Sequence, residues 1–146
     1  MDVTAALMLV SAGAFAGGAV SFSWSRVPIW RAMELGSFRD DFAATIRRTD
    51  KVQPALLVVA ILSTIAFAVA ADSSATGFAW MAAAGFIVTL VASVAILMPL
   101  QRQIIRGGIA QRSDVEAMRA RWFQGHLGRS VVSMASFVST VLAVTL

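Results

Sequence analysis

Four apolar stretches, each long enough to cross a lipid bilayer, constrain this chain more than any other feature. They run from about 3–24, 54–71, 76–100 and 127–146, and Arg129 is the only charged residue within them. Over the whole chain, 58% of the residues are hydrophobic and 14% are charged. Because lipid offers the backbone no hydrogen-bond partner, stretches of this length predict membrane-spanning helices. The sequence therefore predicts an all-α integral membrane protein, a single domain over residues 1–146.

Positive charge is concentrated on one side of the predicted membrane. All twelve Lys and Arg residues lie between the first and second spans or from the end of the third span to the start of the fourth. With four spans these segments share a side, and an excess of Lys and Arg marks the cytoplasmic side. We expect an up-down-up-down four-helix bundle in the bacterial cytoplasmic membrane, with both termini outside. The same placement explains the net charge of +4 without a nucleic-acid partner.

Both cytoplasmic segments carry helical patterns of their own. Phe38, Phe42 and Ile46 recur every four residues, which predicts a short amphipathic helix at the membrane interface. Ser113 and Glu116 have the spacing of a capping box, and no proline follows before the fourth span. A second cytoplasmic helix is therefore expected to run continuously into the membrane.

Small residues form stripes on the first and fourth spans. Gly13 and Gly17 make a small-x-x-x-small motif, which allows close helix approach. Ser133, Ser136 and Ser139 repeat at three-residue spacing. We expect their hydroxyls to bond their own helix backbone, the alternative being a polar substrate path. These stripes favour a homo-oligomer of unspecified size.

The only histidine lies where the second cytoplasmic helix enters the fourth span. Trp122, His126 and Arg129 are spaced i, i+4, i+7, so they share a helix face. Arg129 lies at a depth where an unpaired cation is costly and should face the bundle interior or extend to the interface. Gln101 follows Pro99, which removes a helix hydrogen bond and can bend the third helix toward a cavity.

The end of the first helix adds Trp30 and Arg31 to this group of candidates. Together these residues predict a cytoplasm-facing pocket with aromatic walls, suited to a small planar molecule. Two simpler interpretations stay open: His126 and Arg129 meet a lipid phosphate, and Trp30 and Trp122 are interfacial anchors.

The order of the four spans, the segment PLQRQI after the third span and the motif Trp122-x3-His126-x2-Arg129 resemble the anthrone-oxygenase-like family. Many members of that family are known only as a domain of unknown function. The family often has Asn where this chain has Gln101. The resemblance covers nearly the whole chain and implies oxidation of an anthrone to an anthraquinone by dioxygen during aromatic polyketide biosynthesis, without metal or flavin.

The residues suit that chemistry. His126, with an unperturbed pKa of about 6.5, would remove the acidic proton of a lipophilic substrate, and Arg129 would stabilise the oxyanion. Gln101 would orient a substrate oxygen, while Trp122, Trp30 and Arg31 would bind the ring system. We expect no metal and no cofactor besides dioxygen as co-substrate, because the chain has one His and no Cys. A metal shared between subunits remains open. The alternative function is a non-catalytic bundle that binds membrane lipids or a partner membrane protein.

Overall fold

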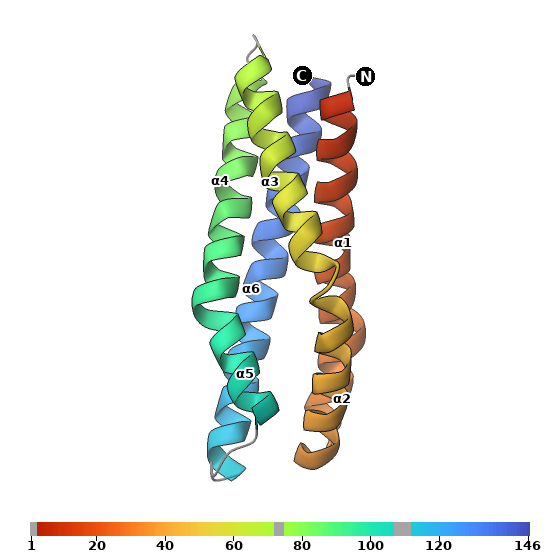
Figure 1. Cartoon of the computed structure of the whole chain (residues 1–146), viewed down its shortest axis with the longest axis vertical. Helices are drawn as coiled ribbons and strands as arrows, with labels where there is room; N and C mark the ends of the chain where they lie inside the picture. The colour runs from red at the N-terminus through yellow and green to blue at the C-terminus, as the bar shows by residue number, and fades with distance from the viewer. Residues whose placement is uncertain (1–2, 72–74, 107–111) are drawn as a thin grey trace.

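The chain folds into helices that lie along one long axis (Figure 1). The computed structural model describes residues 3–71, 75–106 and 112–146. The helices are α1 (Val3–Ala32), α2 (Leu35–Thr49), α3 (Gln53–Ala70), α4 (Thr76–Ala92), a π-helical turn η1 (Ser93–Leu97), α5 (Met98–Arg106) and α6 (Arg112–Thr145). No strand occurs in these described ranges, so the predicted all-α class is confirmed. The two termini lie at the same end of the bundle.

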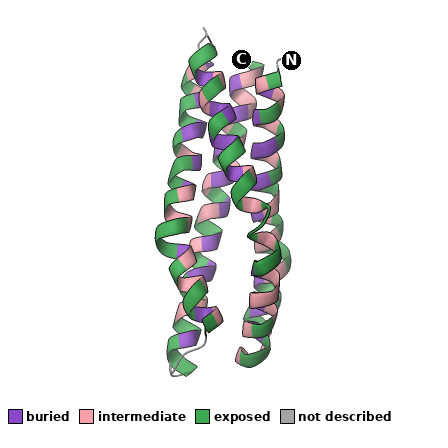
Figure 2. Ribbon diagram, viewed as in Figure 1, coloured by how far each residue is buried: buried purple, intermediate pink, exposed green. Residues whose placement is uncertain are grey.

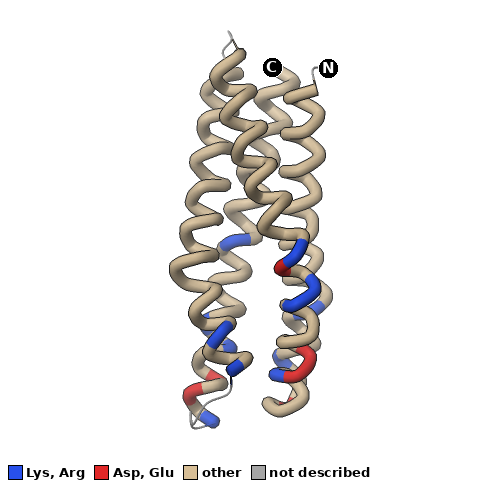
Figure 3. The backbone as a smooth tube through the Cα atoms, in the orientation of Figure 1, with Lys and Arg blue, Asp and Glu red and all other residues tan. Residues whose placement is uncertain are grey.

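Four helical segments are long and apolar enough to cross a membrane. They are Val3–Ala32, Gln53–Ala70, Thr76–Arg106 and Arg112–Thr145, and each contains one of the predicted spans almost completely. Among the described residues, the charged ones lie only in the half of the bundle away from the termini (Figure 3). Neither α3 nor α4 contains a charged residue. The protein is therefore an integral membrane protein whose described residues form a half without charged residues, the uncharged half, and a basic half.

Small residues allow the helices of the uncharged half to pack closely. A Cβ added at Gly13 of α1 would lie 3.1 Å from the Phe137 ring of α6, and one at Gly85 of α4 would meet the Ser136 hydroxyl. Buried residues accordingly lie on the facing sides of the helices (Figure 2). Gly13 and Ser136, which belong to the stripes of small residues, therefore lie at contacts between helices of the same chain.

The serines of α6 bond their own helix. The hydroxyls of Ser133, Ser136 and Ser139 donate to backbone carbonyls four residues earlier, at 2.6, 2.9 and 3.0 Å. This pattern confirms the expectation that intramembrane serine satisfies itself on its own backbone.

In the basic half, an aromatic cluster joins α1, α2 and α6. It comprises Trp30, Phe38, Phe42, Trp122 and Phe123, all buried. The Trp30 ring lies 5.0 Å from Phe42 and 5.9 Å from Trp122 between centroids. The apolar face of α2, expected at the membrane interface, is therefore covered by the chain's own helices. The reason is that α2 runs back beside the end of α1 instead of leaving the bundle.

The third span changes its winding before Pro99. In the π turn η1, the Met98 N–H bonds the Ser93 carbonyl five residues earlier. Pro99 has no N–H to continue the regular ladder, and a local π turn is one way in which a membrane helix accommodates such an interruption. The helix nevertheless continues as α5, so residues after Pro99 stay close to α6.

The fourth span and the helix before it form one continuous helix, as predicted. α6 has 34 residues, beginning at Arg112, one residue before the expected cap Ser113. At 1.5 Å per residue it extends about 50 Å, more than the hydrocarbon thickness of a bilayer. Consequently α6 carries side chains from the basic half into the uncharged half.

Candidate functional site

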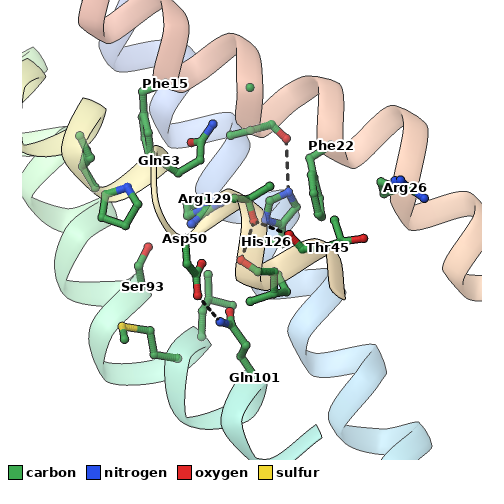
Figure 4. A pocket seen from close by; sticks show the side chains of 18 of the residues that line it. Phe15, Phe22, Arg26, Thr45, Asp50, Gln53, Ser93, Gln101, His126 and Arg129 are labelled. Atoms are coloured by element: carbon green, nitrogen blue, oxygen red, sulfur yellow. Dashed lines mark hydrogen bonds between the residues drawn. The ribbon is translucent and has the colours of Figure 1, made fainter. Parts of the chain in front are cut away.

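A cavity of about 560 Å³ lies where the basic and uncharged halves meet. Five parts of the chain contribute walls: α1, the end of α2, the start of α3, the α4–η1–α5 segment and α6. The lining includes the polar and aromatic residues Phe15, Phe22, Asp50, Gln53, Gln101, Trp122, His126 and Arg129, all of which except Trp122 are labelled in Figure 4. The size and mixed lining are those of a small-molecule site.

His126 is held rigidly in the cavity wall. The ring is 1% exposed and stacks on Trp122, with centroids 4.9 Å apart and planes 6° from parallel. The edge of Phe22 contacts the imidazole at 5.3 Å. Nε2 lies 3.3 Å from the Ala19 carbonyl oxygen, which can only accept, so Nε2 carries the hydrogen. In the neutral ring the lone pair is then on Nδ1, which is buried without a hydrogen-bond partner.

Ser130 contacts the same Ala19 carbonyl as His126. Its oxygen lies 3.1 Å from the Ala19 carbonyl oxygen and 2.9 Å from the His126 carbonyl oxygen, and these two acceptors share its one hydrogen. Ser23 of α1 lies 3.0 Å from the Ser130 oxygen. These bonds fix α6 against α1 beside the imidazole.

Arg129 follows one turn deeper on α6. Its guanidinium carbon lies 5.9 Å from the centre of the Phe15 ring, and its buried Nε has no partner. Within the described part of the chain, the ion pairs are Arg26–Asp41 and Arg112–Glu116, so Arg129 is not in one. Asp50 attracts it electrostatically from beyond ion-pair distance. A cation in this setting can bind an anionic oxygen that enters the cavity.

Gln101 lines the cavity as predicted, but its amide nitrogen is already occupied. Nε2 donates to Asp50 Oδ2 at 2.7 Å, which joins α5 to the turn between α2 and α3. Figure 4 draws this bond between two side chains that both line the cavity. Asp50 is therefore part of this wall, although the sequence analysis did not single it out.

Trp30 and Arg31 lie outside the cavity lining, in contrast to their predicted place in the pocket. Trp30 is completely buried in the aromatic cluster, where Nε1 donates to Asp41 Oδ2 at 2.6 Å. The Arg31 guanidinium lies 5.7 Å from the Phe123 ring centre. The physical reason is that α1 continues through Pro28 and carries both residues one turn past Arg26, the last α1 residue in the wall.

Sequence comparison agrees with this geometry. A family model for anthrone oxygenase matches residues 42–139, more than half of the chain. The chain belongs to the anthrone oxygenase family. Trp122, His126 and Arg129 fall within the matched range, which confirms the resemblance drawn from that motif. No curated protein and no solved structure matches the chain.

One further cavity residue of this anthrone oxygenase family member escaped the sequence analysis. Gln53 begins α3 directly before Pro54, where the second apolar stretch was expected to start. Because it lies between the charged loop and the span, the sequence gives it only as a residue at the span boundary. A polar amide next to the first apolar turn of a membrane helix is the feature that could have indicated a cavity residue.

Polar atoms without partners gather around the cavity. In the part of the chain that the structure describes, five buried side-chain nitrogen or oxygen atoms have no hydrogen bond. Four of them belong to cavity residues: Gln53 Oε1, Trp122 Nε1, His126 Nδ1 and Arg129 Nε. Because buried polar groups are normally bonded, their concentration here indicates a site where water or a ligand with polar groups supplies the missing bonds.

Proposed function

We propose that this protein is a membrane-embedded oxygenase that oxidises a lipophilic, anthrone-like aromatic substrate with dioxygen, without metal or flavin. The observation that carries the proposal is the partnerless Nδ1 of His126 in the wall of an aromatic cavity, one turn from Arg129. Membership of the anthrone oxygenase family supports the reaction class.

The reaction requires a base and an oxyanion site. Nδ1 of His126 removes a proton from the ring carbon opposite the substrate carbonyl, and the negative charge spreads to the carbonyl oxygen. Arg129 stabilises that oxygen, while Trp122 holds both the imidazole and the substrate ring. Dioxygen accepts electrons from the anion and forms a carbon–oxygen bond, giving a hydroperoxide after reprotonation. Loss of water leaves the quinone, so one substrate and one dioxygen give one quinone and one water.

Gln101 has a supporting role in the proposal. Its Nε2 is held by Asp50, so the amide oxygen is the part left to orient a hydroxyl or hydroperoxide group. Trp30 and Arg31 contribute by fixing the end of α1 against α6, at Trp122 and Phe123, through the aromatic cluster.

The proposed placement in the membrane follows from charge. The basic half faces the cytoplasm, the four spans alternate in direction, and both termini face outward in a bacterial cytoplasmic membrane. The cavity then lies at the depth where a lipophilic molecule leaves the hydrocarbon region. We also propose a homo-oligomer. Gly17 is exposed on α1, and no heavy atom of the chain lies within 4 Å of the position that a Cβ would occupy there, so a second copy can approach this face closely.

The direct test is dioxygen uptake by isolated membranes supplied with an anthrone. We expect His126→Gln to lower kcat about 100-fold or more, in the range typical for loss of a general base. Gln124→Ala, an exposed change on the same helix, is the control and should retain wild-type activity. Membranes without the protein give the spontaneous oxidation rate. Equal rates for wild type and His126→Gln above that background would exclude His126 as the base.

A lipid-binding function is the second candidate, favoured by the unpaired Nε of Arg129. Native mass spectrometry of the detergent-purified protein separates the two. A phospholipid that co-purifies with the wild type and is absent from Arg129→Gln, together with no dioxygen uptake by the wild type, would favour the lipid-binding bundle.

A further inference from the structure

Gln53 reaches the cavity because Gly18 leaves room for its amide. A Cβ added at Gly18 of α1 would collide with Gln53 Nε2. The neighbouring Gly17 has nothing within 4 Å of the corresponding position. Of these two adjacent glycines, only Gly18 is in contact with Gln53, so the missing side chain there shapes the cavity.

The Gln53 amide is incompletely bonded within the protein. Its Oε1 is buried and has no hydrogen-bond partner. Leaving a buried acceptor unsatisfied is unfavourable, so a partner from outside the chain, a water molecule or a ligand group, would stabilise it. Gln53 lines the same cavity as His126, so a ligand in the cavity can supply that partner.

The nearby polar groups do not supply that partner. Figure 4 draws Gln53 beside Phe15 and Arg129. Arg129 Nε and Gln53 Oε1 are both without partners, so they do not bond each other. The Asp50 carboxylate can only accept when ionised, and it already accepts from Gln101.

We propose that Gln53 binds a hydroxyl group on the aromatic substrate and so selects hydroxylated ring systems. A hydroxyl donates to Oε1 and can also accept from Nε2, which matches both ends of the amide. The inference rests on the proposed function for the aromatic nature of the ligand. His126 and Arg129 act at the reacting carbon and oxygen, whereas Gln53 recognises a substituent that takes no part in the reaction.

The test measures binding of ligands that cannot be oxidised. The probes are 2-(hydroxymethyl)anthraquinone and 2-ethylanthraquinone, which have similar size but differ in the hydroxyl, and the corresponding 1-substituted pair. Affinities are measured with the full chain purified in detergent, from quenching of tryptophan fluorescence. We expect the hydroxylated probe to bind about tenfold more tightly at one of the two positions, as one buried neutral hydrogen bond allows.

Two variants connect that preference to Gln53. Gln53→Met keeps an unbranched side chain but removes the amide, and Gly18→Ala displaces the amide with a Cβ. Both should bind the hydroxylated and ethyl probes equally, whereas Gly17→Ala should keep the tenfold preference. His126→Gln should keep it as well.

The outcomes separate this inference from the proposed function. Equal binding of each pair by the wild type, or a preference that survives both Gln53→Met and Gly18→Ala, would overturn the role of Gln53. A preference that disappears in these variants, in a protein that consumes no dioxygen, would support the hydroxyl site and refute only the oxygenase. Because the first comparison uses the wild type alone, it does not depend on how the variants fold.

Discussion

Replacing Gly125 by alanine tests how closely α6 approaches the π turn beside the cavity. A Cβ at Gly125 would lie 2.7 Å from Leu97 Cδ2, closer than real Cβ contacts. Gly128, three residues later on the same helix, has nothing within 4 Å of its Cβ position. The two glycines therefore form a matched pair that differs in contact with Leu97.

The expected difference in the free energy of unfolding between Gly125→Ala and Gly128→Ala follows from two opposing contributions. Alanine is favoured over glycine inside a helix by about 1 kcal/mol, and this gain applies at both positions. Overpacking a buried contact costs about 1–3 kcal/mol, and it applies only at Gly125, because Leu97 is 4% exposed. We expect Gly128→Ala to raise the free energy of unfolding by about 1 kcal/mol. The free energy of unfolding of Gly125→Ala should be about 1–3 kcal/mol lower than that of Gly128→Ala.

Unfolding in mixed detergent micelles, followed by circular dichroism, measures both variants. A double-mutant cycle with Leu97→Ala should show a favourable coupling, since removing the branched end of Leu97 removes the collision. Displaced Leu97 would also enter the cavity that it lines, so Gly125→Ala should weaken binding of an anthraquinone probe. Equal stability of the two glycine variants, with no coupling to Leu97, would refute the close approach.

Two further predictions concern the aromatic cluster and the orientation in the membrane. Asp41→Ala removes the acceptor of the buried Trp30 Nε1 and should lower the free energy of unfolding by about 1–3 kcal/mol. Arg26→Gln breaks only the partly exposed ion pair with Asp41 and should cost under about 1 kcal/mol; a larger cost than for Asp41→Ala in thermal unfolding would contradict this account. Because the chain has no native cysteine, single Ser37→Cys and Thr145→Cys variants report topology. An impermeant maleimide should label Thr145→Cys in intact spheroplasts and Ser37→Cys only after lysis; the reverse pattern would invert the proposed orientation.

Some of the candidate site follows directly from sequence spacing. Trp122, His126 and Arg129 line one cavity because helix geometry places residues at i, i+4 and i+7 on one face. Gln101 is in the wall because the helix continues after Pro99. These predictions needed only the periodicity of a single helix.

The positions of other residues depend on contacts between helices and could not be predicted from the spacing within one helix. Trp30 was expected in the pocket, but α2 folds back beside α1 and encloses it in the aromatic cluster. Gln53 was missed because its place in the cavity depends on the close approach to Gly18, which is distant in sequence. Spacing within one helix does not show how far two helices are rotated against each other.

The sequence by itself determined the membrane class, the four spans and the basic side, because lipid acts on each segment locally. A bilayer requires an apolar length and bonded backbone in every span, and charge placement follows from the same demand. Tertiary structure alone decided that Asp50 and Gln53, from other parts of the chain, share the cavity with His126 and Arg129 and that Trp30 does not. That depends on the π turn before Pro99 and on the close approaches at Gly18 and Gly125, where the absence of a side chain sets how two helices meet.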